Sequence, residues 1–156
     1  AGTADVLIEV LDKYKEIGIE FELGCCIYPT APFITVDKLQ SAFDLLIDKN
    51  YDSVFPVVRF SYPIQRALKI NNEGKAKMFQ PENLEKRSQD LEPAYHDAGQ
   101  FYLFKVNEFL QQKKLWTINT GCIILPEIEV QDIDNETDWK IAEMKYNLKK
   151  EMNENI

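Results

Sequence analysis

Two acidic side chains near the C-terminal end of the chain are the residues best suited to chemistry. Asp132 and Asp134 stand two positions apart in the segment 131–139. Alternate side chains of a strand share one face, so an extended backbone here would direct both carboxylates to the same side and Ile133 to the other. Carboxylate oxygens at such a point are ligands for Mg²⁺. A solvated strand end explains the same residues, and spacing alone favours that alternative because Asp-x-Asp is short and common.

A helix is predicted directly after these acids. Asn135 is a candidate N-cap, and Asp138 stands three residues later, as in a near capping box. Acids in the first turn and the lysines Lys149 and Lys150 at the predicted end both suit the helix dipole. The apolar stripe of this helix is formed by Trp139, Ala142 and Tyr146.

Composition limits the class of protein. The chain has 156 residues, of which 45% are hydrophobic and 28% charged, as in an ordinary soluble domain, so residues 1–156 are predicted to form one domain with a real core. No apolar run approaches a membrane span, and a net charge of −8 argues against nucleic acid or an acidic membrane as the partner. Three cysteines cannot all pair, so reduced thiols in a cytoplasmic protein are expected.

The basic residues are unevenly distributed. All three arginines, Arg59, Arg66 and Arg87, lie in one stretch that carries seven basic and three acidic residues, so its charge is +4 while the rest of the chain is −12. The guanidinium fork matches carboxylate and phosphate groups, which favours binding of a small anion. A basic face used for dimer contacts or solubility accounts for the stretch equally well.

The elements that would position these residues follow from periodicity. Helices are predicted from about Ala4 and after Thr35, and strands at 21–28, at 53–59 with a bulge or edge at Pro56, and at 120–125. The strand–helix–strand spacing predicts a parallel pair, with ligands beyond the carboxyl ends of the strands. A hairpin is predicted around Asn71–Gly74, followed by a long polar loop over 80–100.

Four stretches together resemble one family. The segments Cys26–Phe33, Asp52–Val58, Arg87–Tyr102 and Asp132–Asp138 are similar, in this order, to motifs of bacterial sialic acid (N-acylneuraminate) cytidylyltransferases. The third segment resembles the branch that activates pseudaminic acid, a nonulosonic acid. The resemblance implies an α/β, Rossmann-like fold of the nucleotide-diphospho-sugar transferase type, with a mostly parallel sheet flanked by helices. It also implies a protruding hairpin-and-loop arm, residues 60–104, for dimerisation and sugar binding.

The resemblance further implies a reaction in which CTP and the sugar acid give the CMP-sugar and pyrophosphate. Asp132 and Asp134 match the aspartates that bind the catalytic Mg²⁺, and Arg87 matches an arginine that reaches the sugar acid, often from the partner subunit of a homodimer. Tyr28 stands where relatives commonly carry Gln. The other residues that fall near sugar-pocket positions are Gln65, Arg66, Gln89, Tyr102 and Trp116, and His96 is a further candidate sugar contact.

One feature departs from this family. Its members open with a strand and a Gly/Arg/Lys-rich loop around the triphosphate, whereas this sequence begins at a helix. The chain is therefore expected to be an N-terminally truncated fragment that does not turn over CTP alone. Two alternatives stay open: another nonulosonic acid, of the neuraminic or legionaminic type, as substrate, or a non-catalytic sugar-binding or assembly module without the nucleotide loop.

Overall fold

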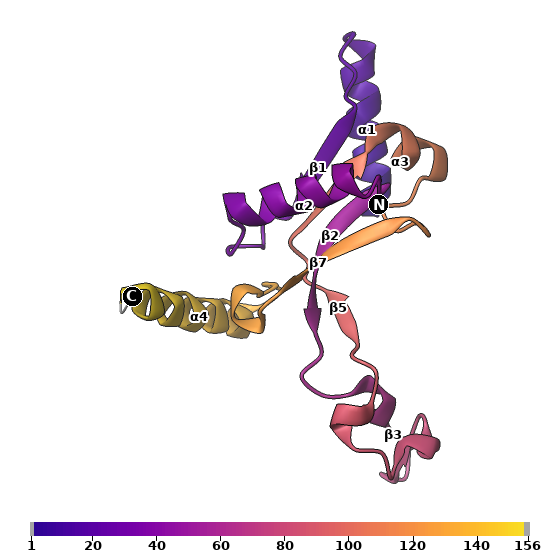
Figure 1. Cartoon of the computed structure of the whole chain (residues 1–156), viewed down its shortest axis with the longest axis vertical. Coiled ribbons are helices and arrows are strands. Elements are labelled where there is room, and N and C mark those ends of the chain that lie inside the picture. The colour runs from indigo at the N-terminus through magenta and orange to yellow at the C-terminus, as the bar shows by residue number, and fades with distance from the viewer. Residues whose placement is uncertain (1, 155–156) are drawn as a thin grey trace.

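The structure, a computed structural model that describes residues 2–154, has an α/β fold with helices on both faces of one sheet (Figure 1). The helices are α1 (Thr3–Glu16), α2 (Val36–Asp48), α3 (Val106–Gln112) and α4 (Glu136–Glu154). The strands are β1 (Leu23–Ile27), β2 (Ser53–Arg59), β3 (Leu68–Ile70), β4 (Ala76–Met78), β5 (Tyr95–Asp97), β6 (Phe101–Lys105) and β7 (Thr120–Leu125). Short 3₁₀ turns form η1 (Ile64–Arg66), η2 (Pro81–Asn83), η3 (Ser88–Asp90) and η4 (Glu127–Glu129).

The main sheet is mixed, and the prediction of a mostly parallel sheet is wrong. Its five strands run in the order β1-β6-β2-β5, with β7 on β2. Only β2 and β7 pair in parallel; the β1–β6, β2–β6 and β2–β5 ladders are antiparallel. The β1–α2–β2 crossover does make β1 and β2 run in the same direction, but β6 lies between them. Sequence spacing predicts the crossover and cannot show that a strand from much later in the chain fills the gap.

Pro56 lies inside a central strand and is fully buried, so the predicted edge or bulge is not what accommodates it. On one side of β2, Ser53 and Val54 pair with β6, and the ladder resumes with β5 at Val57. Pro56 stands at the break between these two ladders, where its carbonyl accepts the Ala98 amide at 3.0 Å. A residue without an N–H is tolerated there because the ladder is already interrupted.

Strand β6 is buried on both faces and contributes to two of the three buried hydrophobic clusters among the described residues. Phe101 and Leu103 pack with α2, whereas Tyr102 and Phe104 pack with α3 and the apolar face of α1. This alternation follows from the two-residue period of a strand. Phe101 and Phe109 are 0% and 2% exposed, and burial of each such ring stabilises the fold by roughly 1.5–3 kcal/mol.

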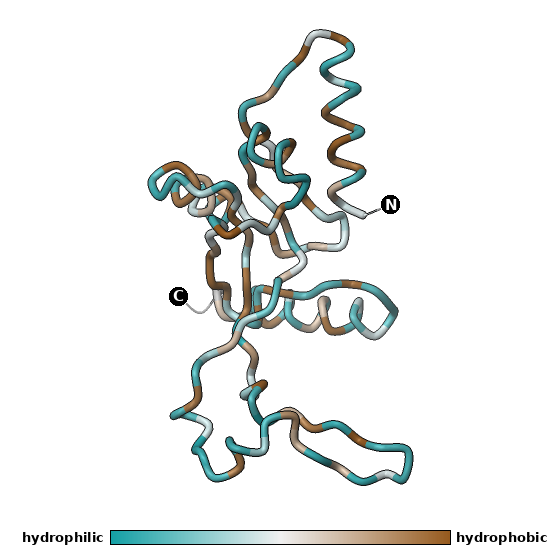
Figure 2. Tube along the Cα trace, turned by 90° about the vertical axis from the view of Figure 1, so that its right-hand side faces the viewer, coloured by the Kyte–Doolittle hydropathy of each residue, from teal (hydrophilic) through white to brown (hydrophobic). Residues whose placement is uncertain are grey.

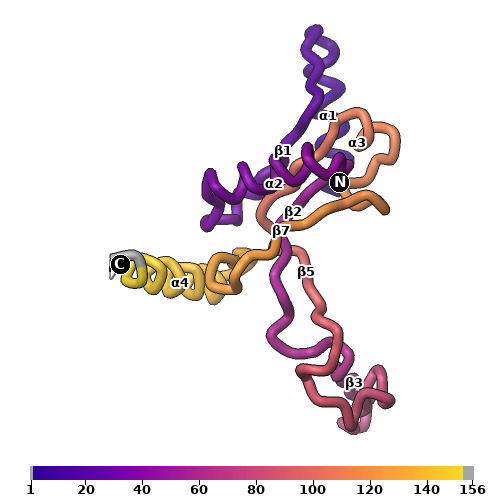
Figure 3. The backbone as a smooth tube through the Cα atoms, viewed as in Figure 1, coloured from indigo at the N-terminus to yellow at the C-terminus, as the bar shows by residue number. Residues whose placement is uncertain are grey.

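Residues 60–94 project beyond the sheet as an arm (Figure 3). The predicted hairpin is confirmed: β3 and β4 pair antiparallel, and Asn71 Oδ1 accepts the amides of Glu73 and Lys75 at 3.0 and 2.9 Å. The chain then returns through β5 into the main sheet, so the part of 60–104 that projects ends near residue 94. Figure 2 shows apolar stretches along this arm, and Tyr62 is 84% exposed.

The acidic segment is a loop, so the prediction that Asp132 and Asp134 continue a strand is wrong. Strand β7 ends at Leu125, Pro126 follows, and η4 separates the strand from the acids. The helix predicted after the acids is confirmed, because α4 begins at Glu136. It continues past the predicted end at Lys149 and Lys150 to Glu154 and extends away from the sheet (Figure 1). Within residues 2–154, no helix combines the length and apolarity needed to cross a bilayer.

Candidate active site

A pocket of about 530 Å³ opens at the carboxyl ends of β1 and β2, as expected for ligand sites in such sheets. Tyr28 enters it from the end of β1 and Arg59 from the end of β2. Asp97 comes from the last position of β5, Gly99 from the β5–β6 connection, and Asp132 from the acidic loop. The remaining polar lining of this central pocket comes from Ser61, His96, Glu127, Gln131 and Lys145.

Gly99 lies between two carboxylates. Its φ of +63° is in the left-handed region, and a β-carbon there would stand 3.3 Å from Asp132 Oδ2. Its amide donates a 2.9 Å hydrogen bond to Asp97 Oδ1. A side chain at residue 99 would therefore push the Asp132 carboxylate outward by a few tenths of an ångström, besides being disfavoured by the positive φ.

Asp134 is placed differently from Asp132. Both residues are exposed, but only Asp132 lines the central pocket. The Asp134 and Asn135 amides donate to Asp138 Oδ2 at 3.1 and 3.2 Å, and Asn135 Oδ1 accepts the Thr137 and Asp138 amides at 2.9 and 3.1 Å. The predicted Asn135–Asp138 capping box is thus confirmed, and it fixes the backbone of the acidic loop at the start of α4.

The donor set fits Mg²⁺ with a bound phosphate rather than a complete protein cage. Within residues 2–154, no three His, Cys, Asp or Glu side chains are grouped to hold a metal. Mg²⁺ is commonly held by one or two carboxylates, with substrate phosphates and water completing its shell. Asp132, set against the backbone of Gly99 at an open pocket, offers such an oxygen ligand, and Asp134 is two residues away.

Tyr102 and Tyr28 form one wall of the central pocket. The Tyr102 hydroxyl donates to Asp97 Oδ2. Burial, together with the hydrogen bond to Asp97 and the charge of its carboxylate, raises the pKa of Tyr102, so the hydroxyl stays protonated. The two tyrosine rings meet edge to face with centroids 5.7 Å apart, and the Tyr28 hydroxyl lies 2.9 Å from Thr3 Oγ1. Tyr28 therefore links α1 to the pocket.

Trp116 does not line the central pocket. Its ring stacks on Phe55 with centroids 4.8 Å apart and is 58% exposed. Phe55 in turn packs against Tyr102 at 5.5 Å. Trp116 thus reaches the pocket only through two intervening rings.

The predicted arm residues are divided among several places. Gln89 lines a second pocket of about 490 Å³, the basal pocket, which lies between the root of the arm and the end of β7. Gln65 donates to the Glu92 carbonyl at 2.9 Å, and Arg66 borders a separate, open hollow with Tyr62. Arg87, exposed at the start of η3, lines neither the central nor the basal pocket.

Arg59 and Lys145 are the positive side chains of the central pocket, and the site prediction does not include them. Arg59 borders the central and the basal pocket alike. The sequence points to Arg59 only as one of three clustered arginines and as the last residue of the predicted strand 53–59, with a basic face for dimer contacts or solubility as the equal alternative. No sequence pattern singles out Lys145, because its place depends on how α4 packs against η4. The sequence includes Asp97 and Gly99 in the Arg87–Tyr102 motif but does not single out either of them as a site residue.

His96, a candidate sugar contact, does line the central pocket. Its Nδ1 lies 2.8 Å from the Asp97 carbonyl and donates to that oxygen. Its ring packs against Phe60 with centroids 4.7 Å apart. These contacts hold the imidazole at the junction of the arm and the pocket.

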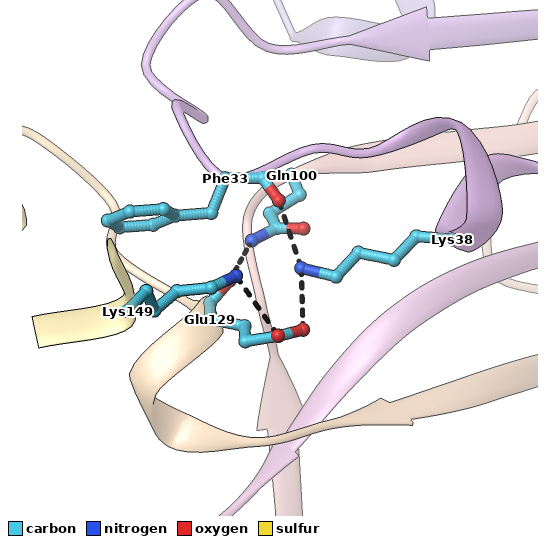
Figure 4. A network of polar contacts seen from close by, with 5 residues as sticks. All are labelled: Phe33, Lys38, Gln100, Glu129 and Lys149. Carbon is cyan, nitrogen blue, oxygen red and sulfur yellow. Dashed lines mark hydrogen bonds and ion pairs between the residues drawn. The ribbon is translucent and has the colours of Figure 1, made fainter. Parts of the chain in front are cut away.

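A polar network joins α2 and α4 to the η4 turn, which precedes the acidic loop (Figure 4). Lys38 Nζ contacts Glu129 Oε2 at 2.9 Å and donates to the Phe33 carbonyl at 2.9 Å. Lys149 Nζ contacts Glu129 Oε1 at 3.0 Å. Hydrogen bonds from Lys38, then from Lys149, lower the pKa of Glu129 against the opposing effect of burial. Glu129 therefore remains a carboxylate between two cations.

No family model matches the chain, but comparison with known proteins finds several relatives. The chain is 34% identical over 144 residues, 92% of its length, to the pseudaminic acid cytidylyltransferase of Campylobacter jejuni, of which it covers 61%. It is 30% identical over 123 residues to the pseudaminic acid cytidylyltransferase and UDP-2,4-diacetamido-2,4,6-trideoxy-beta-L-altropyranose hydrolase of Helicobacter pylori, with 78% of the chain and 23% of that protein aligned. It is 28% identical over 145 residues, 88% of the chain, to the N-acylneuraminate cytidylyltransferase of Oncorhynchus mykiss, of which it covers 32%. The chain thus spans less than two thirds of each of these three relatives.

Proposed function

Because the chain belongs to the pseudaminic acid and N-acylneuraminate cytidylyltransferase family, we propose that it is part of an enzyme that transfers CMP from CTP to pseudaminic acid. The observation that carries this proposal is the central pocket, where Asp132 meets Arg59 and Lys145. A site that joins an acidic metal ligand to cationic side chains suits a reaction between a metal-bound triphosphate and a sugar acid.

In this reaction the anomeric hydroxyl oxygen of the sugar bonds to the α-phosphorus of CTP while the bond to the β-phosphate oxygen breaks, and pyrophosphate leaves. Asp132 and Asp134 would hold Mg²⁺, which when bound neutralises triphosphate charge and lowers the pKa of the attacking hydroxyl. Arg59 and Lys145 supply positive charge to the same pocket. Phosphoryl-type transfer needs positioning and charge neutralisation more than covalent chemistry. These acidic and basic residues are of the types that such a reaction requires.

The sugar acid would be held from two sides. Tyr28 and Tyr102 form the pocket wall against which an acyl group can pack, with Trp116 supporting this wall through Phe55. Arg87 supplies the bidentate contact to the sugar carboxylate across a dimer. Gln65, Arg66 and Gln89 belong to the root of the arm and shape the approach to the site.

A homodimer formed through the arm is part of this proposal. The arm carries exposed apolar side chains that the described part of the chain does not cover: Tyr62, Leu68, Ile70, Phe79 and Leu84. Such side chains gathered on one projecting segment are typical of an interaction surface. A cytoplasmic location is supported by Cys25, Cys26 and Cys122, all of which are free thiols.

We propose pseudaminic acid rather than another nonulosonic acid as the substrate, and the only ground for this choice is sequence identity. The chain is 34% identical to the Campylobacter pseudaminic acid enzyme and 28% identical to the Oncorhynchus N-acylneuraminate enzyme. A neuraminic or legionaminic acid remains the second candidate, and direct competition between the sugar acids separates the two.

The test uses the full-length product of the reading frame that encodes this sequence. Pyrophosphate release is measured with CTP, Mg²⁺ and each sugar acid in turn. Pseudaminic acid should give the highest kcat/KM, and Asp132→Asn combined with Asp134→Asn should abolish turnover. Asp12→Asn, an exposed acid on α1, is the matched control and should leave turnover unchanged. Normal turnover in the double variant would refute the assigned site, and absence of turnover with every sugar acid would favour the non-catalytic module.

A further inference from the structure

The η4 turn, which precedes the acidic loop, is held by side chains from several other elements. Lys145 of α4 donates to the Glu127 and Val130 carbonyls at 3.1 and 2.7 Å. Gln100, fully buried at the start of β6, donates to the Glu129 carbonyl at 2.8 Å. The backbone carbonyls of this turn are therefore fixed from the sheet on one side and from α4 on the other.

The Glu129 side chain adds a second set of contacts. Lys38 of α2 and Lys149 of α4 each bind one of its carboxylate oxygens, at 2.9 and 3.0 Å. Lys38 is only 8% exposed, and its ammonium also donates to the Phe33 carbonyl. We call the five residues Lys38, Gln100, Glu129, Lys145 and Lys149 the η4 clamp.

This arrangement is a costly way to gain stability. The Lys38 side chain is only 9% exposed, so taking its ammonium out of water has a desolvation cost that its partners must offset, and an apolar side chain of the same volume often stabilises as well. Lys38 and Lys149 do not line the central pocket, so they are not substrate contacts there. The clamp does fix the position of the backbone just before Asp132, because only Val130 and Gln131 separate the fixed turn from that residue.

We infer that the η4 clamp positions Asp132 against Gly99, and that Lys38 and Lys149 are positioning residues for the divalent-cation site. This inference rests on the metal-binding role of Asp132 in the proposed function. Residues that do not bind the metal but orient a metal-binding side chain commonly change metal affinity by 10- to 100-fold when they are removed. Loss of either lysine would let the turn move and would weaken the hold of Asp132 on a cation.

The electrostatic effect of removing a lysine on cation affinity is opposite in sign to the effect that a positioning role predicts. Lys38→Met and Lys149→Met each remove a positive charge from beneath an acidic loop, and through the field alone they would strengthen cation binding. The positioning role predicts the reverse, a loss of affinity. Lys140→Met is the matched control, because Lys140 is an exposed lysine of α4 outside the clamp.

The experiment titrates Mn²⁺ against the full-length product in the presence of a fixed concentration of CTP and counts free Mn²⁺ by electron paramagnetic resonance, with a protein-free CTP sample as the reference. Asp132→Asn identifies the signal that belongs to the site. We expect about tenfold weaker Mn²⁺ binding in Lys38→Met and Lys149→Met, and unchanged or tighter binding in Lys140→Met. Circular dichroism checks that each variant is folded, and Lys149, which is less buried than Lys38, is the variant better able to tolerate the change.

The outcomes separate this inference from the proposed function. Folded Lys38→Met and Lys149→Met proteins that bind Mn²⁺ as tightly as the parent, or more tightly, would overturn the positioning role and leave the metal site standing. A parent chain without any Asp132-dependent Mn²⁺ binding would overturn the metal site and this inference together. A lower unfolding temperature with unchanged Mn²⁺ affinity would show that the clamp serves stability alone.

Discussion

Asp132 Oδ2 lies close against the backbone of Gly99: a β-carbon on residue 99 would stand 3.3 Å from that oxygen, a tighter contact than most β-carbons make. The two residues are far apart in sequence and come from different elements, the β5–β6 connection and the loop before α4. Their contact joins the segment most like the pseudaminic acid branch to the acidic motif.

Gly99→Ala should therefore affect the site more than the fold. The φ of +63° at Gly99 disfavours any side chain, and the strain should cost roughly 1–2 kcal/mol of unfolding free energy. The added methyl also displaces the Asp132 carboxylate, so Mn²⁺ binding and turnover of the full-length product should fall together. Gly74→Ala is the matched control, because Gly74 has a φ of +79° and nothing within 4 Å of its β-carbon position. Equal Mn²⁺ affinity in both variants would contradict the argument.

Glu129 predicts an acid-dependent loss of stability. Its pKa is lowered from the ordinary value of 4.5, first by the hydrogen bond from Lys38 and then by that from Lys149. A lowered pKa in the folded state gives stabilisation that is present above pH 4.5 and is lost as the pH falls through the folded-state value. The unfolding free energies of the parent and of Lys38→Met should therefore differ most near neutral pH and converge below pH 4.5. Urea titrations across this range measure the difference, and a gap independent of pH would show that Lys38 does not act through the Glu129 charge.

Asp52 should be the most sensitive acid for stability outside the site. Its carboxylate accepts hydrogen bonds from Gln112, Thr117 and Asn119 at 3.0, 2.8 and 2.9 Å, which joins the end of α3 to the start of β7. Burial raises the pKa of Asp52, but these hydrogen bonds outweigh it and the net direction is downward. Asp52→Ala should lower the unfolding free energy by about 1–3 kcal/mol, since hydrogen bonds to a charged group are lost.

Asp48→Ala controls for the loss of one negative charge. Asp48 is exposed in the last turn of α2, where an acid opposes the helix dipole. Its removal should change stability by less than about 0.5 kcal/mol. If Asp52→Ala is no more destabilising than Asp48→Ala in the same urea titration, the three hydrogen bonds are not holding α3 to β7.

The sequence was most informative where the signal is local. The start of the helix after Thr35, the hairpin at Asn71–Gly74 and the Asn135–Asp138 box all depend on residues within one turn of each other. The structure confirms each of them, although the Thr35 side chain makes no capping hydrogen bond. The mixed sheet could not be predicted in this way. Strand β6 enters between β1 and β2 because it can bury both of its faces, and this is a property of the whole assembly.

The candidate site also contains some residues that a local sequence pattern predicts and others that only the fold brings together. Asp132 and Asp134 stand out as a pair in the sequence, yet the structure gives them different surroundings because a loop, unlike a strand, does not direct alternate side chains to one face. Lys145 reaches the central pocket through the packing of α4, and Asp97 lines it from the last position of β5. Neither has a local pattern, so only the three-dimensional fold could reveal them.

Arg87 provides the sharpest test of the proposed dimer. It lies on the arm, outside both the central and the basal pocket of its own chain, so the proposal has it act on the site of a partner copy. Arg87→Ala and Asp132→Asn should each inactivate the full-length product. When the two variants are mixed and allowed to exchange subunits, each mixed dimer regains one site with an intact Asp132 and an intact Arg87. Random exchange in a two-fold dimer makes about half of the dimers mixed, so activity should return to roughly a quarter of the parent value. Mixing Asp132→Asn with Asp134→Asn is the matched control and should restore nothing, because both changes fall in the same site. If the Arg87→Ala mixture also stays inactive while mass spectrometry shows that subunits have exchanged, Arg87 does not act across the dimer.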